Sequence, residues 1–325
     1  MTTVPIALVQ HPPVFLNLRA SVARAVELIA DAARKGARVV SFPECWLPGY
    51  PVWVDFAPRA AIWDEVGAKQ LYRHLAKNAV VLGDEHLALI QQAADHHEVF
   101  VVMGTHERKG GTLYNTSFLF SPGLNEPVIH RKLVPTYTER LIWGRGDGST
   151  LNTVDTPWGP LGVLICWEHW MPEARIAMHK AGEILHIAQW PIVKDMHQVA
   201  SRHYAFEGSV PVAAVGSLLR YDEIVADVEA MADANDLRAG IDLLKSMQPE
   251  TAFVHNGGSM VVDASGDVLV APQFDTQSII TADISLDTRD EALLTFDSTG
   301  HYSRPDVFEL TVDRRVKTGI SNRID

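Results

Sequence analysis

A lone cysteine near the middle of the chain is the first candidate for chemistry. Cys166 is one of two cysteines among 325 residues, and it follows the apolar run 161–165 and precedes a helical pattern. A thiol in that place should lie where a buried strand ends and a helix begins. Helix amide dipoles and a nearby cation would favour the thiolate over the thiol, although a free cysteine can also be an inert core residue.

A nucleophilic thiol needs partners. With an ordinary pKa of about 8.5 it is mostly protonated at pH 7, so it requires a base and a cationic or orienting group. Glu44 follows the strand expected over 38–42 and begins a loop rich in Pro, Gly and Trp. Desolvation there would raise its pKa toward that of a general base, and the alternative is a surface glutamate in a turn. Cys45 is interpreted as structural, because neighbouring side chains at a strand end point to opposite faces.

A second segment contains a candidate cation. Lys132 follows a short strand expected over 128–131, and Glu139 comes seven residues later, beyond a proline. A lysine aimed into a site can stabilise negative charge on a tetrahedral intermediate, and a second carboxylate can hold that lysine and carry protons. The alternative is a solvated, charged loop.

These residues depend on strands and helices that alternate along the chain, which predicts an α/β layer fold with a mixed sheet. The segment 221–249 is polar and helix-prone and is expected to form a helical excursion over the surface. The tail from about residue 297 is expected to pack on a neighbouring subunit. Strands are expected over 4–9, 38–42, 99–104, 113–120, 128–131, 161–165, 184–188, 210–215, 260–262, 268–270 and 279–284, and helices over 17–35, 86–97 and 173–181.

Composition excludes several classes of protein. The formal net charge is −12 and the pI is about 5.6, which argues against nucleic acid or an anionic membrane as the main partner. No apolar stretch approaches the roughly 18 residues of a membrane span, and no secretory signal is evident at the N-terminus. Two cysteines cannot build a disulfide framework, so we expect a cytoplasmic protein.

Three short motifs resemble a known superfamily. Phe-Pro-Glu around Glu44, Arg-Lys-Leu-x-Pro-Thr around Lys132 and Cys-Trp-Glu around Cys166 occur in that order. Together they resemble the carbon–nitrogen hydrolase (nitrilase) superfamily, and the resemblance covers nearly the whole chain. Three further segments are similar to its nitrilase branch: 48–51, 136–144 and 300–306.

The resemblance implies a fold, a reaction and roles for four side chains. The fold would be a four-layer α-β-β-α sandwich with mixed sheets, formed by a single domain over 1–325. The enzyme would hydrolyse an organic nitrile to a carboxylic acid and ammonia, using water and no metal or organic cofactor. Cys166 would attack and form a thioimidate and then a thioester, Glu44 would act as base, Lys132 would stabilise charge and Glu139 would hold Lys132. Members of the superfamily commonly assemble, so a homo-oligomer is expected.

Two segments depart from the family pattern and leave the substrate open. Residues 189–191, Gln-Trp-Pro, are bulkier than the small residues often found there, and the excursion over 221–249 also differs. The same catalytic residues could serve an amidase or an N-carbamoyl amidohydrolase of the same superfamily. A non-catalytic scaffold with the same fold is the third interpretation.

Several aromatic residues could form an apolar wall for an arylaliphatic nitrile, or could be packing. The candidates are Tyr50, Trp53, Tyr137, Trp167 and Trp190. The chain also has 14 histidines, but those at 96, 97, 197 and 203 match no recognisable metal-ligand set such as H-E-x-x-H. The G-x-S-x-G elbow of a serine hydrolase and the C-x-x-C motif of a redox enzyme are absent from the sequence.

Overall fold

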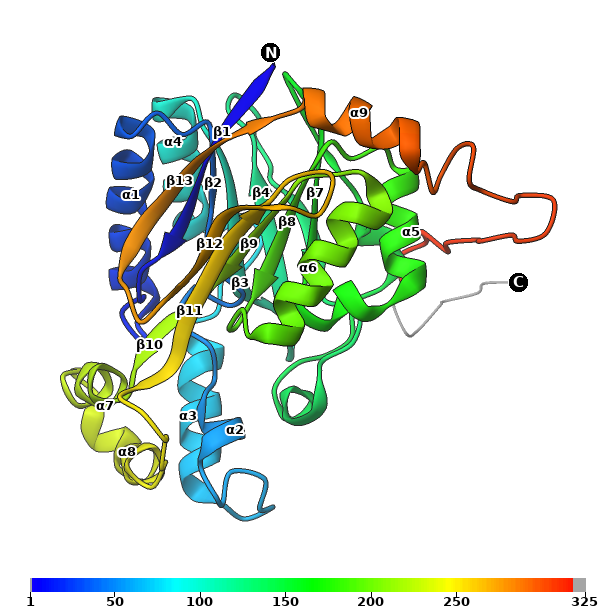
Figure 1. Cartoon of the computed structure of the whole chain (residues 1–325). Helices are drawn as coiled ribbons and strands as arrows, with labels where there is room; N and C mark the ends of the chain where they lie inside the picture. The colour runs from blue at the N-terminus through cyan, green and yellow to red at the C-terminus, as the bar shows by residue number, and fades with distance from the viewer. Residues whose placement is uncertain (1, 318–325) are drawn as a thin grey trace, which may run out of the picture.

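Two β-sheets stacked face to face form the centre of the protein, in a computed structural model that describes residues 2–317 (Figure 1). The six-stranded sheet has the order β13-β1-β2-β3-β4-β5, and the seven-stranded sheet has the order β10-β11-β9-β8-β7-β6, with β12 paired to β11. The first sheet contains β1 (Thr3–Gln10), β2 (Val39–Ser41), β3 (Phe100–Lys109), β4 (Thr112–Phe120), β5 (Val128–Arg131) and β13 (Ser278–Ser285). The second contains β6 (Val154–Thr156), β7 (Gly159–Ile165), β8 (Leu185–Trp190), β9 (Val212–Gly216), β10 (Leu218–Arg220), β11 (Phe253–Val262) and β12 (Val268–Phe274).

Both sheets are mixed, as predicted. The strands β1, β2 and β3 run parallel in the first sheet, and β7, β8 and β9 run parallel in the second. The remaining pairs are antiparallel, including the long β3–β4 hairpin. Valine, isoleucine and leucine side chains from both inner faces form one buried cluster between the sheets. This packing suits parallel strands, which are usually covered on both faces.

Helices cover the outer face of each sheet and complete four layers, α-β-β-α (Figure 1). On the first sheet lie α1 (Leu18–Arg34) and α4 (Glu85–His97), and on the second lie α5 (Pro172–Lys180) and α6 (Asp195–Gly208). The sequence of α1 explains its start, because the Asn17 side chain accepts a hydrogen bond from the Ala20 N–H. Its buried residues recur at helical spacing and face the sheet.

A second group of helices lies at one end of the sandwich. It contains α2 (Trp53–Phe56), α3 (Val66–Lys77), α7 (Tyr221–Glu229) and α8 (Arg238–Lys245), with apolar residues of all four in one cluster. The segment 221–249, predicted as a helical excursion over the surface, is helical. Its helix α8 packs tightly against α3, because an added Cβ on Gly67 of α3 would lie 2.4 Å from the Ala239 carbonyl oxygen in α8. The helices α2 and α3 were not predicted, because their buried face meets residues remote in sequence.

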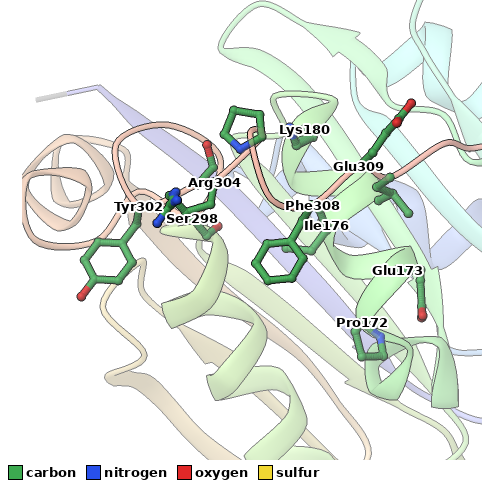
Figure 2. A pocket seen from close by; sticks show the side chains of 12 residues that line it. Pro172, Glu173, Ile176, Lys180, Ser298, Tyr302, Arg304, Phe308 and Glu309 are labelled. Atoms are coloured by element: carbon green, nitrogen blue, oxygen red, sulfur yellow. The ribbon is translucent and has the colours of Figure 1, made fainter.

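The C-terminal segment returns across α5. After α9 (Asp287–Thr295), which was not predicted, residues 298–310 and α5 enclose a surface cavity of about 490 Å³ (Figure 2). Tyr302 and Phe308 of this segment are largely exposed. Arg314 donates to the carbonyl oxygen of Leu151, so the tail also contacts the body of its own chain. Across the described residues, no helix is long and apolar enough to cross a membrane.

Candidate active site

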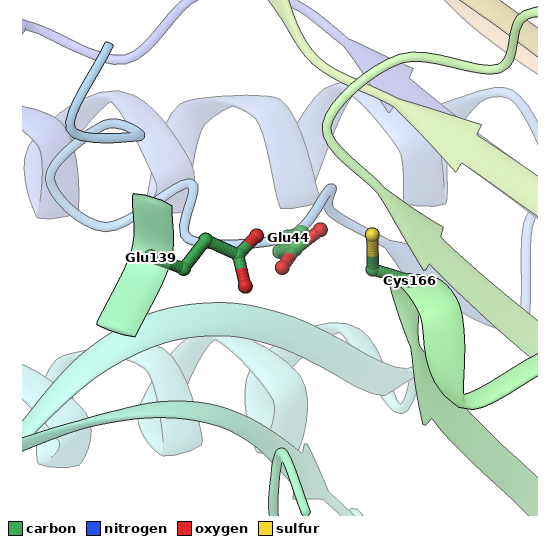
Figure 3. Close-up of side chains that lie close together, drawn as sticks. All are labelled: Glu44, Glu139 and Cys166. Carbon is green, nitrogen blue, oxygen red and sulfur yellow. The ribbon is translucent and has the colours of Figure 1, made fainter. Parts of the chain in front are cut away.

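Four side chains from distant segments meet in the interior at the carboxyl ends of strands from both sheets. Glu44 lies just beyond β2, and Lys132 directly follows β5. Glu139 lies in the 3₁₀ helix η1 (Tyr137–Leu141), and Cys166 begins the 3₁₀ helix η3 (Cys166–Trp170) after β7. Figure 3 shows the Glu44 carboxylate between Glu139 and the sulfur of Cys166. All four predicted catalytic side chains are therefore in one place, and each is buried.

Lys132 links the two carboxylates. Its Nζ lies 2.8 Å from Glu44 Oε1 and 2.7 Å from Glu139 Oε2. The Cys166 sulfur and one oxygen from each carboxylate lie within 4.8 Å of one another. Because the site holds two carboxylates and one ammonium, its charges sum to −1 when Glu44 is ionised. Because the cluster is buried in a medium of low polarity, any change in its total charge has a large electrostatic effect.

Glu139 is held rigidly on its other side. The Tyr50 hydroxyl donates to Glu139 Oε1 at 3.0 Å, and the Thr136 N–H donates to Oε2 at 2.6 Å. The contact with Thr136 is part of a capping box at the start of η1. Tyr50 thus contacts the catalytic cluster as a support for Glu139, a role that the aromatic pattern of its loop does not reveal.

Glu44 has one bound oxygen and one free oxygen. Asn115 Nδ2 in β4 donates to Oε1 at 2.6 Å, beside Lys132, whereas Oε2 is buried without a partner among the described residues. Burial raises the pKa of Glu44 from 4.5 to about 7, opposed by the Lys132 charge and reinforced by the Glu139 charge. A carboxylate with that pKa and a free oxygen is suited to exchanging protons. The sequence alone did not reveal the role of Asn115, because an asparagine within a strand follows no motif.

Cys166 has a strained backbone and a neutral thiol. Its φ of +55° places a non-glycine residue in the left-handed region, as at other functional sites. Burial and then the Glu44 charge raise the pKa of the thiol well above its usual value, while Lys132 and the Trp167 N–H oppose that rise. The expectation that the surroundings favour a thiolate was therefore wrong. Lys132 is already shared by two carboxylates, and η3 is too short to add a strong dipole.

Glu168 connects the end of β7, which precedes Cys166, to the end of β5, which precedes Lys132. Its carboxylate accepts hydrogen bonds from His130 Nε2 at 2.8 Å, from the Leu133 N–H at 2.8 Å and from the Ile165 N–H at 2.6 Å. Burial would raise the pKa of Glu168, but His130 and these donors lower it. The buried carboxylate is thus ionised and fully bonded. It fixes the residues flanking Lys132 and Cys166 against each other.

The aromatic candidates separate into two groups. Trp167 and Tyr137 are exposed, by 54% and 81%, and line a surface pocket of about 670 Å³ that also includes Trp170 and Met171. Trp53 and Trp190 are buried in separate apolar clusters: Trp53 packs edge-on to Phe15, and Trp190 stacks on His169. For Trp53 and Trp190, the structure thus shows the packing that was the alternative interpretation.

One set of side chains within the described residues has the ligand types and spacing for a metal ion, namely Glu44, Glu139 and Cys166. The Lys132 ammonium lies against both carboxylates. It supplies the positive charge that a cation would bring, so a metal would have to displace it. The histidines considered from sequence are elsewhere: His96 and His97 end α4, and His197 packs on Trp190.

Comparison with known proteins assigns the family. The carbon–nitrogen hydrolase family matches residues 5–292, and the chain belongs to this family, on its nitrilase branch. It is 38% identical over 325 residues to an aliphatic nitrilase of Sinorhizobium fredii, covering 99% of this chain and 100% of that protein. It is 36% identical over 321 residues to nitrilase 1 of Arabidopsis thaliana, covering 98% and 90%. The fold matches Saccharomyces cerevisiae Nit3, of branch 10 of the superfamily, with TM-score 0.67, 18% identity and coverage of 93% and 97%.

Proposed function

We propose that the chain is a nitrilase, which hydrolyses an organic nitrile to the carboxylic acid and ammonia with Cys166 as nucleophile. The observation that carries the chemistry is the buried cluster in which an oxygen of Glu44 lies within 4.8 Å of the Cys166 sulfur, with Glu44 Oε2 unpartnered among the described residues. The choice of a nitrile over an amide is supported by full-length similarity to nitrilases at 38% and 36% identity. The substrates are the nitrile and water.

In the first half of the reaction, proton transfer and attack occur together. The Cys166 thiol gives its proton to Glu44 as the sulfur adds to the nitrile carbon. Glu44 then passes that proton to the nitrile nitrogen, which gives the thioimidate and restores the Glu44 carboxylate. Passing the proton within the cluster leaves its total charge at −1, so the cost of a free buried thiolate is avoided. Positioned proton transfer of this kind is worth about 10²–10⁴-fold in rate.

In the second half, two waters are consumed. Glu44 activates the first water, which adds to the thioimidate carbon and gives a tetrahedral species stabilised by Lys132. Protonation of its nitrogen releases ammonia and leaves an acyl thioester. The second water, activated in the same way, releases the carboxylic acid and restores the thiol. Glu139 holds Lys132 throughout, through the 2.7 Å contact.

Activity should depend on the ionisation of Glu44. Since Glu44 must accept a proton, its carboxylate form is the active form, and with a pKa of about 7 it is increasingly protonated as the pH falls below 7. We expect kcat/KM to fall about tenfold per unit of pH below that value. Initial rates of ammonia release between pH 5 and 9 would measure this limb. A profile that is flat down to pH 5 would contradict the role of Glu44 as base.

A substrate panel tests the proposed reaction against its alternatives. We expect ammonia release from nitriles, with acid as the main product, and little from the matching amides or N-carbamoyl amino acids. Ammonia and both carbonyl products would be measured for aliphatic, aromatic and arylaliphatic pairs. Faster turnover of the amides would assign the amidase reaction, and turnover of neither group would favour a non-catalytic scaffold.

We also infer that one domain spans the chain and that the protein works in the cytoplasm as a homo-oligomer. Apolar side chains at Tyr302 and Phe308 support assembly, since they are exposed beside α5. Free Cys45 and Cys166 support a reducing compartment. Sedimentation velocity would test the assembly, and a monomer at micromolar concentration would contradict it.

A further inference from the structure

A chain of buried polar side chains leads away from the nucleophile into the second sheet. His169 Nδ1 lies 2.7 Å from the carbonyl oxygen of Cys166, and His169 Nε2 lies 3.0 Å from His186 Nε2. His186 Nδ1 then lies 2.7 Å from Glu183 Oε2. We call His169, His186 and Glu183 the histidine relay. All three are at most 1% exposed, and none takes part in the reaction steps described above.

The hydrogen bonds of the relay fix where its protons are. A carbonyl oxygen can only accept, so His169 Nδ1 carries the proton. Burial and the neighbouring His186 hold the pKa of His169 well below its usual value, so His169 Nε2 is an acceptor and His186 Nε2 must donate. His186 Nδ1 faces the carboxylate of Glu183 and donates as well. Both ring nitrogens of His186 are therefore engaged, Nε2 with His169 and Nδ1 with Glu183.

Glu183 is built to remain a buried anion. It also accepts hydrogen bonds from His179 Nδ1 at 3.1 Å and from the Tyr204 hydroxyl. Burial alone would raise the pKa of Glu183, but His186 and His179 lower it to about 2. The strand β7 leaves room for this carboxylate, because an added Cβ on Gly162 would lie 1.9 Å from Glu183 Oε2. Glycine is required at that position to keep the relay in place.

The relay acts on the peptide group that joins Cys166 to Trp167. That planar unit presents its carbonyl oxygen to His169 on one side and its Trp167 N–H to the Cys166 sulfur on the other. A donor on the carbonyl polarises the peptide and strengthens its N–H as a donor. It also fixes the orientation of the peptide after a residue whose φ is +55°.

We propose that His169 is a positioning residue, held by His186 and Glu183, which orients and polarises the Cys166–Trp167 peptide so that the Trp167 N–H stabilises the negative charge formed on the atom bonded to the reacting carbon. This inference rests on the proposed nitrilase reaction and deepens it. The effect is exerted in the transition state, so it should affect kcat far more than KM.

Three substitutions of His169 separate the proposed role from simple packing. In His169→Asn the amide nitrogen takes the place of Nδ1 and keeps the donor to the Cys166 carbonyl. His169→Gln places its amide near the position of Nε2, and His169→Leu has no donor. We expect kcat about tenfold lower for Leu and Gln, with KM within about twofold, and near wild-type kcat for Asn. Rates would be measured below the unfolding temperature of every variant.

A matched control and a second measurement keep the outcomes distinct. His74→Leu removes another buried histidine, whose Nε2 lies 3.1 Å from the Leu16 carbonyl oxygen in a different cluster, and it should leave kcat unchanged. Alkylation of Cys166 by iodoacetamide needs no substrate and should slow in the Leu and Gln variants but not in Asn. Equal rates in all three variants, or an Asn variant as slow as Leu, would overturn the proposal. Wild-type protein that alkylates normally but turns over no nitrile would instead reject the nitrilase reaction.

Discussion

Replacing Cys166 by alanine should abolish ammonia release from nitriles while the protein stays folded. The substitution removes the atom that forms the thioimidate and thioester, and loss of such a nucleophile costs about 10⁴-fold or more in rate. The fold should tolerate it, because the thiol is small and its removal is expected to change the free energy of unfolding by about 1 kcal/mol or less. Steady-state ammonia assays and thermal unfolding of the same preparation would measure both effects.

Cys45→Ala is the matched control. Cys45 is also buried, also has a positive φ of 50° and directly follows Glu44, but its sulfur lies 3.7 Å from the Thr105 carbonyl oxygen. Its proximity to the site makes the comparison stringent. We expect most of the activity to remain in this variant. An inactive Cys45→Ala protein together with an active Cys166→Ala protein would reassign the nucleophile.

The residues that the sequence identified are those fixed by short motifs next to predicted strand ends. Glu44 and Lys132 follow strands of the first sheet and Cys166 follows a strand of the second, and the stacking of the two sheets brings these strand ends together. Glu139 lies only seven residues after Lys132, and the 3₁₀ helix that carries it is closed by contacts between Glu139 and Thr136, three residues away. Local patterns are therefore informative about these four side chains.

The same local patterns could not predict contacts between residues that are far apart in the sequence. Asn115 reaches Glu44 across 71 positions, and Tyr50 reaches Glu139 across 89. The histidine relay likewise requires β8 to lie beside β7, which only the sheet order specifies. The protonation of Cys166 depends on the sum of all charges around it. A lysine close to a thiol suggests a thiolate. Here, however, the lysine is already paired with two carboxylates.

Replacing Lys132 by methionine should be strongly destabilising as well as inactivating. Lys132 is 1% exposed and is the cation between Glu44 and Glu139, so the substitution leaves two buried carboxylates facing each other. Breaking a buried ion pair by removing one partner costs about 3–5 kcal/mol of stability. Loss of charge stabilisation should lower kcat by about 10²–10³-fold in addition. Chemical denaturation and ammonia assays would give the two quantities.

The double variant Lys132→Met, Glu139→Gln separates those two losses. It returns the total charge of the cluster to −1, with Glu44 as the remaining carboxylate, and the amide oxygen introduced by Glu139→Gln can still accept from Tyr50 or Thr136. Most of the lost stability should therefore return, whereas activity should not, because the group that stabilises the tetrahedral species is still missing. If activity returned along with stability, Lys132 would be a structural counter-ion. The tetrahedral species would then have to be stabilised by the Trp167 N–H alone.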